Sequence, residues 1–165
     1  MPAFARRSTS SAGWPSWSKP HDRALLLNAA GIQPLDEVAL KAGEDVVRLR
    51  QLVRERAVAA GFSLVDQTKI VTAASELGRN TIQYGGGGHA RVAIVQNGSR
   101  LGVRLEFIDR GPGIADLALA LTDGYTTGGG LGLGLSGAKR LSDEFDIKSA
   151  PGQGTQVTIV RWRAF

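Results

Sequence analysis

The stretch Asp123-Gly-Tyr-Thr-Thr-Gly-Gly-Gly-Leu-Gly-Leu-Gly-Leu-Ser-Gly137 decides how the rest of the chain is interpreted. Seven of its fifteen residues are glycine. Glycine loses more conformational freedom on folding than any other residue, so such a run indicates positive φ angles or a close approach to the backbone. Residues 135–142 follow with a helical pattern, and a glycine loop that leads into a helix N-terminus suits an anion. We interpret the stretch as a phosphate-binding lid, and the alternative is an ordinary flexible loop.

Two common phosphate-binding motifs do not fit this stretch. Residues 132–137 match G-x-G-x-x-G, but no strand leads directly into them and no acidic residue follows about 20 positions later, as a Rossmann site requires. The same glycines have Walker A spacing, but Ala138 stands at the lysine position and Lys139 at the Ser/Thr position. The phosphate site therefore has to belong to another class.

The composition is that of an ordinary globular domain, with 42% hydrophobic and 21% charged residues among 165. There is no cysteine, which excludes disulfides, thiolate nucleophiles and Cys-ligated metals. No apolar run approaches the roughly 20 residues of a membrane span, and the N-terminus does not have the pattern of a secretory signal. We therefore expect a cytoplasmic protein with no membrane partner.

The formal net charge of +5 is concentrated at the N-terminal end. Residues 1–35 are rich in Ser, Pro, Ala and Arg, and we expect a largely disordered basic tail there, with a short helix at 24–30. Residues 36–165 are expected to form one folded domain. No basic stripe interleaved with aromatic residues is present, so nucleic-acid binding has no support.

Hydrophobic periodicity predicts two long helices and a set of strands. Residues 44–60 have apolar positions at 46, 49, 53, 57 and 60, and a helix starting at a Ser63–Asp66 capping box has them at 70, 73, 74 and 77. Strands are expected at 37–41, 90–96, 101–108, 145–148 and 155–162, with Asn97-Gly98 as a hairpin turn, and short helices at 116–121 and 135–142. The order predicts an α+β fold, a two-layer α/β sandwich whose mainly antiparallel sheet has its helices on one face.

Four short motifs follow one another in a distinctive order. They are Ser75-Glu-Leu-Gly-Arg-Asn80 on a helix, Asp109-Arg-Gly-Pro-Gly-Ile114 after a strand, residues 123–134, and Gly152-x-Gly-Thr155 before a strand, with residues 139–145 in support. In this order the chain, over residues 36–163, resembles the GHKL (Bergerat) ATP-binding superfamily. Within it the chain is similar to the small bacterial serine kinases of the anti-sigma and stressosome type, and most of all to the RsbT-type switch kinases. Four stretches carry this closer likeness: residues 75–80, 109–114, 123–134 and 139–145.

The resemblance implies a role for each matched residue. Asn80 would ligate Mg²⁺ through its amide oxygen, a hard donor for a hard cation. Glu76, one helical turn earlier, would be the catalytic residue that orients the attacking hydroxyl or accepts its proton. Asp109 would accept a hydrogen bond from the adenine amino group, and Thr155 would support the base. Gly111 and Gly113 would let the chain pass close to the base, and the lid residues Thr127, Gly128, Gly130, Leu131, Gly132, Leu133 and Gly134 would close over the phosphates of ATP.

The implied function is an ATP- and Mg²⁺-dependent protein serine kinase of a bacterial partner-switching stress response. Its substrate would be a STAS-domain antagonist protein, and it would also bind and activate a serine phosphatase. One alternative is an anti-sigma factor kinase that sequesters a sigma factor. Another is a non-catalytic ATP-binding switch module, for which Glu76→Ala would leave function intact.

Overall fold

The computed structural model describes residues 25–26, 35–125 and 134–165 of the chain. Its helices are α1 Gly43–Ala59, α2 Leu64–Gln83, α3 Leu117–Ala120 and α4 Gly134–Arg140. Its strands are β1 Leu25–Leu26, β2 Asp36–Leu40, β3 Gly88–Asn97, β4 Arg100–Asp109, β5 Glu144–Ser149 and β6 Thr155–Trp162. No helix within these ranges is long and apolar enough to cross a membrane.

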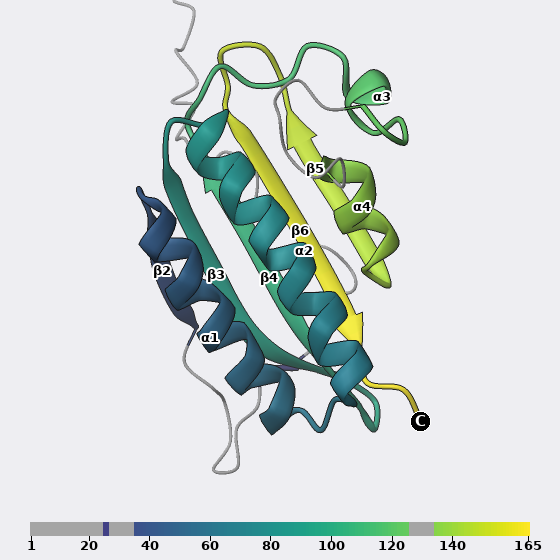
Figure 1. Ribbon diagram of the computed structural model, residues 1–165. Coiled ribbons are helices and arrows are strands. Elements are labelled where there is room, and N and C mark those ends of the chain that lie inside the picture. The colour runs from purple at the N-terminus through teal and green to yellow at the C-terminus, as the bar shows by residue number, and fades with distance from the viewer. Residues whose placement is uncertain (1–24, 27–34, 126–133) are drawn as a thin grey trace, which may run out of the picture.

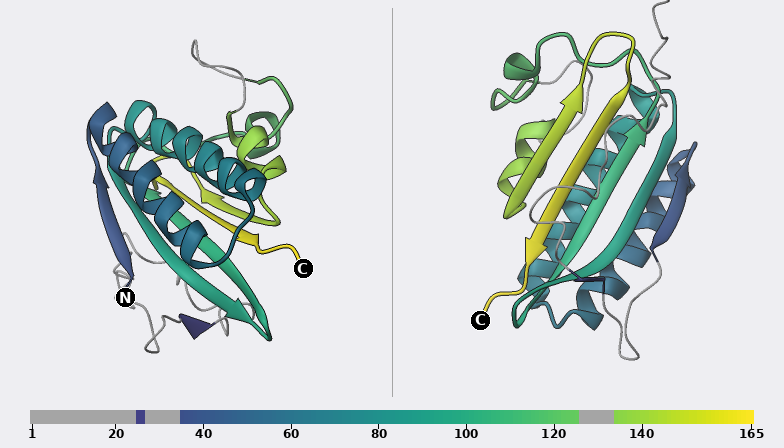
Figure 2. Two further views of the ribbon diagram at one scale, coloured as in Figure 1. Left: turned by 60° about the horizontal axis from the view of Figure 1, so that its bottom comes forward. Right: turned by 180° about the vertical axis from the view of Figure 1, so that it is seen from behind.

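The described strands form one antiparallel sheet in the order β1-β3-β4-β6-β5, with β2 pairing β3 beside β1. Helices α1 and α2 lie side by side across one face, and α4 lies beside α2 above β5 (Figure 1). Seen from behind, the opposite face has no described helix over it (Figure 2). The expected two-layer α+β sandwich with helices on one face is therefore confirmed.

The apolar stripes of both long helices are buried between the helices and the sheet. In α1 the buried apolar residues are Val46, Leu49, Val53 and Ala57, and in α2 they include Ile70, Ala73, Ala74 and Leu77. The helix-breaking residue Gly78 sits where α1 crosses α2, and a Cβ there would lie 3.3 Å from Leu49 Cδ2. The glycine thus lets the two helices pack closely, at a cost of about 1 kcal/mol in helix propensity.

The structure differs from the sequence expectation in two places, one at a hairpin turn and one at a sheet edge. The β3–β4 hairpin forms, but Asn97 pairs with Arg100, so the turn residues are Gly98-Ser99, with Gly98 at φ 59°. A short helix was expected at 24–30, and this is wrong at Leu25–Leu26, which form strand β1 and pair with Gln96 and Val95 of β3. Strand pairing at a sheet edge is a contact with a distant segment, which local periodicity cannot reveal.

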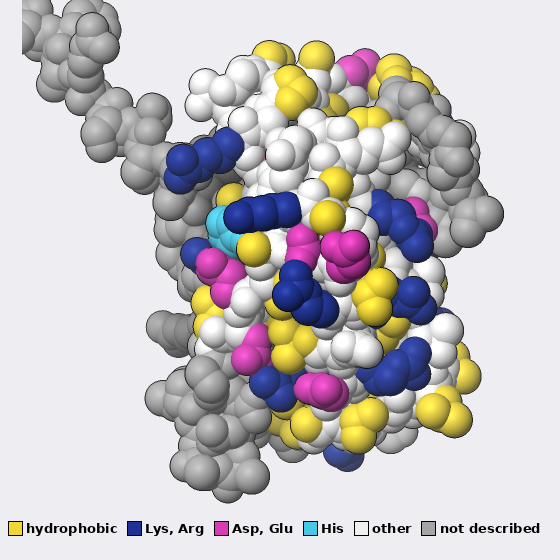
Figure 3. Space-filling model, turned by 60° about the vertical axis from the view of Figure 1, so that its left-hand side comes forward, with side chains coloured by type: hydrophobic (Ala, Val, Ile, Leu, Met, Phe, Trp, Pro, Cys, Tyr) yellow, Lys and Arg dark blue, Asp and Glu magenta, His cyan; other side chains and the backbone are white. Residues whose placement is uncertain are grey.

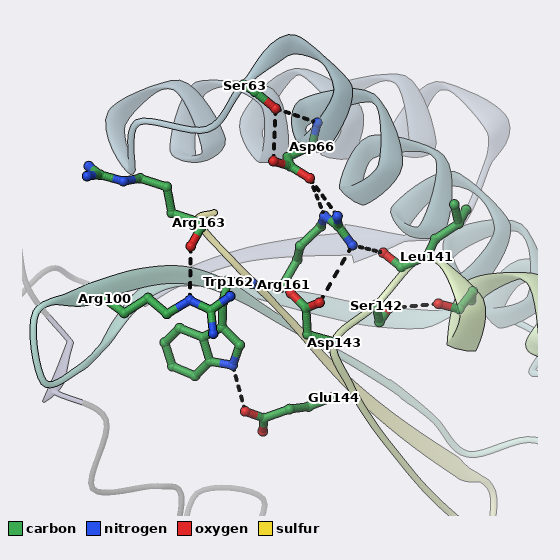
Figure 4. A network of polar contacts seen from close by, with 11 residues as sticks. Ser63, Asp66, Arg100, Leu141, Ser142, Asp143, Glu144, Arg161, Trp162 and Arg163 are labelled. Carbon is green, nitrogen blue, oxygen red and sulfur yellow. Dashed lines mark hydrogen bonds and ion pairs between the residues drawn. The ribbon is translucent and has the colours of Figure 1, made fainter. Parts of the chain in front are cut away.

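The start of α2 is tied to the last strand by a buried ion pair (Figure 4). Ser63 Oγ accepts from the backbone N–H of Asp66 at 3.2 Å and donates to the Asp66 carboxylate at 2.8 Å, which confirms the predicted helix cap. The Arg161 guanidinium donates to Asp66 Oδ1 through Nε at 3.0 Å and Nη2 at 2.5 Å. Hydrogen bonding from Arg161 holds the pKa of Asp66 below its usual value, against the opposing effect of burial.

Basic and acidic side chains are interspersed on the side of the molecule where α1 and β2 lie (Figure 3). Two ion pairs connect elements there: Arg56 of α1 with Asp36 of β2, and Arg91 of β3 with Glu37 of β2, at 2.6 and 2.9 Å. Pairs of this kind between partly exposed groups contribute little stability individually. They fix β2 against its neighbours rather than forming a field of one sign.

Candidate nucleotide-binding site

A cavity of about 490 Å³ lies between α2, the segment after β4, α3, the start of α4 and the start of β6. Its volume is within the usual range for small-molecule and cofactor sites. The apolar side chains that line it include Leu77, Phe107, Ile114, Leu119, Leu135 and Val157. The polar groups in its wall include four that were predicted as site residues, namely Glu76, Asn80, Asp109 and Thr155. Glu76 and Thr155, which are 79 positions apart in sequence, thus line the same cavity.

Glu76 and Asn80 reach the cavity from one face of α2, because residues four apart in a helix lie one above the other. The side chain of Glu76 is 12% exposed, and Arg79 Nη1 donates to its Oε1 at 3.1 Å. Arg79 itself is largely exposed at the rim of the cavity. Within the described part of the chain the side-chain amide of Asn80 makes no hydrogen bond. Its side-chain oxygen and nitrogen are therefore available to a ligand.

Asp109, the last residue of β4, presents a half-buried carboxyl group. Its Oδ1 accepts from the backbone N–H of Gly111 at 2.9 Å and of Thr155 at 3.2 Å. Burial raises the pKa of Asp109 above its ordinary value, and the two N–H donors only partly oppose that effect. Both N–H groups use Oδ1, and no described residue donates to Oδ2, so this oxygen of a cavity-lining residue keeps its acceptor capacity.

Close packing of backbone segments explains the glycines around Asp109. A Cβ at Gly85 would lie 2.4 Å from the Asp109 Cγ, and a Cβ at Gly154 would lie 2.2 Å from the Asp109 carbonyl oxygen. The predicted site residue Gly111 packs on the backbone of Gly85 at 2.7 Å, and Gly113 packs on the Ala150 carbonyl oxygen at 2.0 Å, both measured from a built Cβ. Gly113 lines the cavity, whereas Gly111 does not and contacts Gly85, which does.

Ser149 at the end of β5 links three segments around the cavity. Its hydroxyl oxygen accepts from the backbone N–H of Ile114 at 2.8 Å and donates to the carbonyl oxygen of Gly154 at 2.9 Å. It also lies 2.9 Å from the hydroxyl oxygen of Thr155. Thr155 therefore has a fixed hydroxyl as well as a backbone N–H directed at Asp109.

The described ends of the glycine-rich stretch meet beside the cavity. Gly134 is the first residue of α4, has φ 48° and lines the cavity, and a Cβ built on it would lie 3.6 Å from the Tyr125 carbonyl oxygen. An exposed ion pair of 3.0 Å joins Asp123 to Arg140 across the same ends. The remaining predicted lid residues lie outside the described residues: Thr127, Gly128, Gly130, Leu131, Gly132 and Leu133. Their role stays a prediction.

The residues present fit an adenine nucleotide. The apolar lining suits an aromatic base, and the free acceptor of Asp109 suits an amino group on that base. In the described ranges no cluster of three acidic or histidine side chains could hold a metal ion alone. Mg²⁺ in nucleotide sites takes one or two protein ligands together with phosphate oxygens and water, so the single amide of Asn80 is compatible with it.

The sequence interpretation missed the residues whose roles depend on contacts between segments. Gly85 and Ser149 are the clearest cases, since each contacts a segment that is more than 20 residues away in sequence. The apolar lining residue Tyr125 was inside the quoted stretch but was not assigned a role. A glycine immediately after the helix of Glu76 and Asn80 was the one available signal for Gly85.

Comparison with known proteins gives consistent results. Residues 65–164 match the family described as histidine kinase-, DNA gyrase B-, and HSP90-like ATPase. The chain is 44% identical over 118 residues, 72% of its length, to the serine/threonine-protein kinase RsbT of Bacillus subtilis (strain 168), and the alignment covers 89% of that protein.

A solved structure of the RsbU and RsbW domains of a Mycobacterium tuberculosis protein is similar in fold. Its TM-score is 0.56 at 24% identity over 81% of this chain, which spans 33% of that longer chain. The matched family, the similar solved structure and the identified relative all agree with the family suggested by the motifs that line the cavity. The chain therefore belongs to the histidine kinase-, DNA gyrase B- and HSP90-like ATPase family, as a protein serine/threonine kinase of the RsbT type.

Proposed function

We propose that this chain uses ATP and Mg²⁺ to phosphorylate a serine of a small STAS-domain antagonist protein in a bacterial partner-switching stress response. The observation that carries the proposal is that Glu76 and Asn80 of one motif and Asp109 of another line one cavity. The 44% identity to a protein named as a serine/threonine-protein kinase supports the same reading. The cytoplasm is the compartment in which such a partner and ATP occur together.

Each polar group of the cavity has a role in this proposal. Asp109 Oδ2 accepts a hydrogen bond from the adenine amino group, while the two backbone N–H donors keep its carboxyl group in place. The amide oxygen of Asn80 would hold Mg²⁺, which would supply positive charge to offset that of the phosphate oxygens. Thr127 to Gly134 enclose the phosphates by the resemblance given above.

Glu76 is the catalytic residue of the proposal. The serine oxygen of the substrate forms a bond to the γ-phosphorus of ATP while the bond from that phosphorus to the β–γ bridging oxygen breaks, and ADP leaves. The hydroxyl proton passes to the Glu76 carboxylate. Arg79, which donates to Glu76 Oε1, holds the carboxylate in one orientation at the rim where a protein substrate has to approach.

The partners follow the same proposal. Besides the STAS-domain substrate, the kinase binds and activates a metal-dependent serine phosphatase. The anti-sigma alternative, in which the chain sequesters a sigma factor, has less support, because the likeness to the RsbW-containing structure is one of fold at 24% identity. A pull-down of a sigma factor that depends on nucleotide would favour the alternative.

Phosphate transfer from ATP to a STAS-domain protein encoded beside this gene tests the proposal. Mass spectrometry should find one added phosphate on a serine when ATP and Mg²⁺ are present, and none when EDTA removes the metal. Asn80→Ala should lose the transfer by at least about 100-fold, as expected for an interaction that stabilises the transferring phosphoryl group. ATP binding without any transfer in the wild type would instead favour the non-catalytic switch.

A further inference from the structure

The Ser149 hydroxyl has a complete set of partners, which determines the direction of each hydrogen bond. A serine hydroxyl carries one proton and two acceptor lone pairs. Its single proton goes to the carbonyl oxygen of Gly154, which can only accept, at 2.9 Å. One lone pair accepts from the backbone N–H of Ile114, which can only donate, at 2.8 Å. The contact of 2.9 Å with Thr155 Oγ1 therefore has Thr155 as the donor.

The consequence for Thr155 is that its hydroxyl faces the cavity only as an acceptor. Its one proton is directed to Ser149, so the lone pairs of Oγ1 are what remains for a ligand. Thr155 lines the cavity, whereas Ser149 lies behind it. The orientation of a hydroxyl group in the cavity wall is thus set by a side chain that does not touch the ligand.

Asp109 adds a second acceptor next to the first. The backbone N–H of Thr155 donates to Asp109 Oδ1, so the two residues are direct neighbours, and no described group donates to Oδ2. A wall with two acceptors complements an amino group, which offers two N–H donors. It opposes a carbonyl group at the same position, because two acceptors facing each other leave both without a proton.

We propose that Ser149 is a positioning residue for base selectivity. Because Ser149 accepts the hydroxyl proton of Thr155, this wall of the cavity presents only hydrogen-bond acceptors to a ligand. The site then favours a purine with a 6-amino group over one with a 6-oxo group. The inference rests on the proposed function, since it assumes that ATP binds in this cavity.

The experiment compares the dissociation constants of ATP and ITP by titration calorimetry on the full chain. The purine of ITP carries a 6-oxo group where ATP has the 6-amino group. In Ser149→Ala the Thr155 hydroxyl is free to turn and donate to the oxo group, so the preference for ATP over ITP should narrow by about three- to tenfold. Asp109 is unchanged in this variant, so part of the preference remains.

Two further variants separate selectivity from general loosening of the site. Ser149→Thr keeps the hydroxyl and should restore the wild-type ratio. Ser142→Ala is the matched control, because Ser142 donates to the Ala138 carbonyl oxygen at the end of α4 and does not line the cavity. It should leave the ratio unchanged. A purely structural role for Ser149 would weaken both nucleotides alike and leave the ratio as it is.

Thr155→Val gives an independent test that does not require Ser149→Ala to fold. It removes the Thr155 acceptor from the wall, so ATP should bind more weakly while the affinity for ITP does not fall. The difference between the dissociation constants of ATP and ITP should therefore narrow. An unchanged ATP-to-ITP ratio in either Ser149→Ala or Thr155→Val overturns the inference. A wild-type chain that binds neither nucleotide contradicts the proposed function itself.

Discussion

At the scale of single residues, Asp109 is the group that we propose as the determinant of nucleotide recognition. Its carboxyl group is half-buried, accepts two backbone N–H groups at Oδ1 and is surrounded by glycines that leave no room for a Cβ. Burying a carboxylate costs free energy that these two hydrogen bonds only partly offset, which is why its pKa is raised. Such a group is poorly placed for stability and well placed to receive a donor from a ligand.

The raised pKa of Asp109 predicts a pH dependence of ATP binding. The ionised carboxylate is the better acceptor, so ATP affinity should fall as the pH decreases through a pKa above the ordinary value of 3.8. Asp109→Asn should bind ATP more weakly at neutral pH, by about tenfold or more, and should lack this component of the pH dependence. Calorimetric titrations of both proteins from neutral pH down to about the ordinary value of 3.8 check it. Parallel pH profiles for the two proteins would contradict the assignment.

The raised pKa of Asp109 has the opposite effect on the pH dependence of folding stability. Because the pKa of Asp109 is higher in the folded state than in the unfolded state, the folded state gains protons first as the pH falls. The free energy of unfolding of the wild type should therefore rise relative to Asp109→Asn as the pH decreases through the raised pKa. Thermal melts of the nucleotide-free proteins over the same pH range measure this difference.

Residues of the site divide clearly by how they could be predicted. Glu76, Asn80, Asp109 and Thr155 were predicted because each belongs to a motif that is visible in one stretch of sequence, and the structure brings them to one cavity. The role of Gly85 depends on the Asp109 side chain, and the role of Ser149 depends on Ile114. Contacts of that kind exist only in the folded chain, so a single sequence does not reveal them.

At the scale of elements, α2 carries the proposed catalytic residue and metal ligand, and it has to be held in place against the sheet. Its N-terminus is capped by Ser63, and the Asp66–Arg161 ion pair ties it to β6, which also supplies Thr155 (Figure 4). Arg161 also donates to the Leu141 carbonyl oxygen after α4. One largely buried guanidinium thus connects the helix of Glu76 and Asn80, the strand of Thr155 and the segment after α4.

Asp66→Ala should lower the free energy of unfolding by about 3 kcal/mol, because it leaves the Arg161 guanidinium buried without its main partner. Urea unfolding measures the loss. Glu44→Ala is the matched control, an exposed acidic residue in the first turn of α1, and should change the free energy by no more than about 0.5 kcal/mol. Equal effects of the two substitutions would contradict the importance of the ion pair.

The same ion pair sets a pH dependence of stability. The pKa of Asp66 is lowered in the folded state, so its contribution is fully present above the ordinary aspartate pKa of 3.8 and is lost as the pH falls through the lowered value. The difference in unfolding free energy between wild type and Asp66→Ala should accordingly shrink under acidic conditions.

Periodicity predicted the long elements well because their burial is one-sided. The apolar stripes of α1 and α2 face the sheet as expected, and the five predicted strands all form. Two features were not predicted because they depend on contacts between distant segments. They are the pairing of Leu25–Leu26 with β3 and the close crossing of α1 and α2 at Gly78. The turn at Gly98-Ser99 differs by one residue from expectation because Asn97 continues the strand.

At the scale of the whole molecule, the cavity and the core are built from the same part of the chain. Every residue that lines the cavity lies between Glu76 and Val157, and the main hydrophobic core runs from Leu40 to Ile159. The fold class could be predicted because the order of helices and strands permits few layer arrangements. The predicted tail, residues 1–35, falls almost entirely outside the described residues, so that boundary remains a prediction.

The domain boundary can be tested with a fragment of residues 36–165. It retains the core and all residues that line the cavity and loses only the two-residue strand β1 among the described elements. We expect it to unfold in one cooperative transition and to bind ATP within about twofold of the full chain, as is usual when a terminal segment outside the core is removed. Calorimetry and thermal unfolding check both statements. Loss of ATP binding in a folded fragment would place part of the domain before residue 36.

The most direct test of the central claim is the rate of phosphate transfer by Glu76→Gln, measured together with its ATP affinity. Glutamine keeps the shape of the side chain but cannot accept the serine proton, so we predict a rate lower by about 100- to 10,000-fold with ATP affinity almost unchanged. Glu55→Gln, an exposed glutamate of α1, is the control and should transfer at the wild-type rate. Wild-type transfer by Glu76→Gln would contradict the account, because the residue at the centre of the proposed kinase site would then have no part in the reaction.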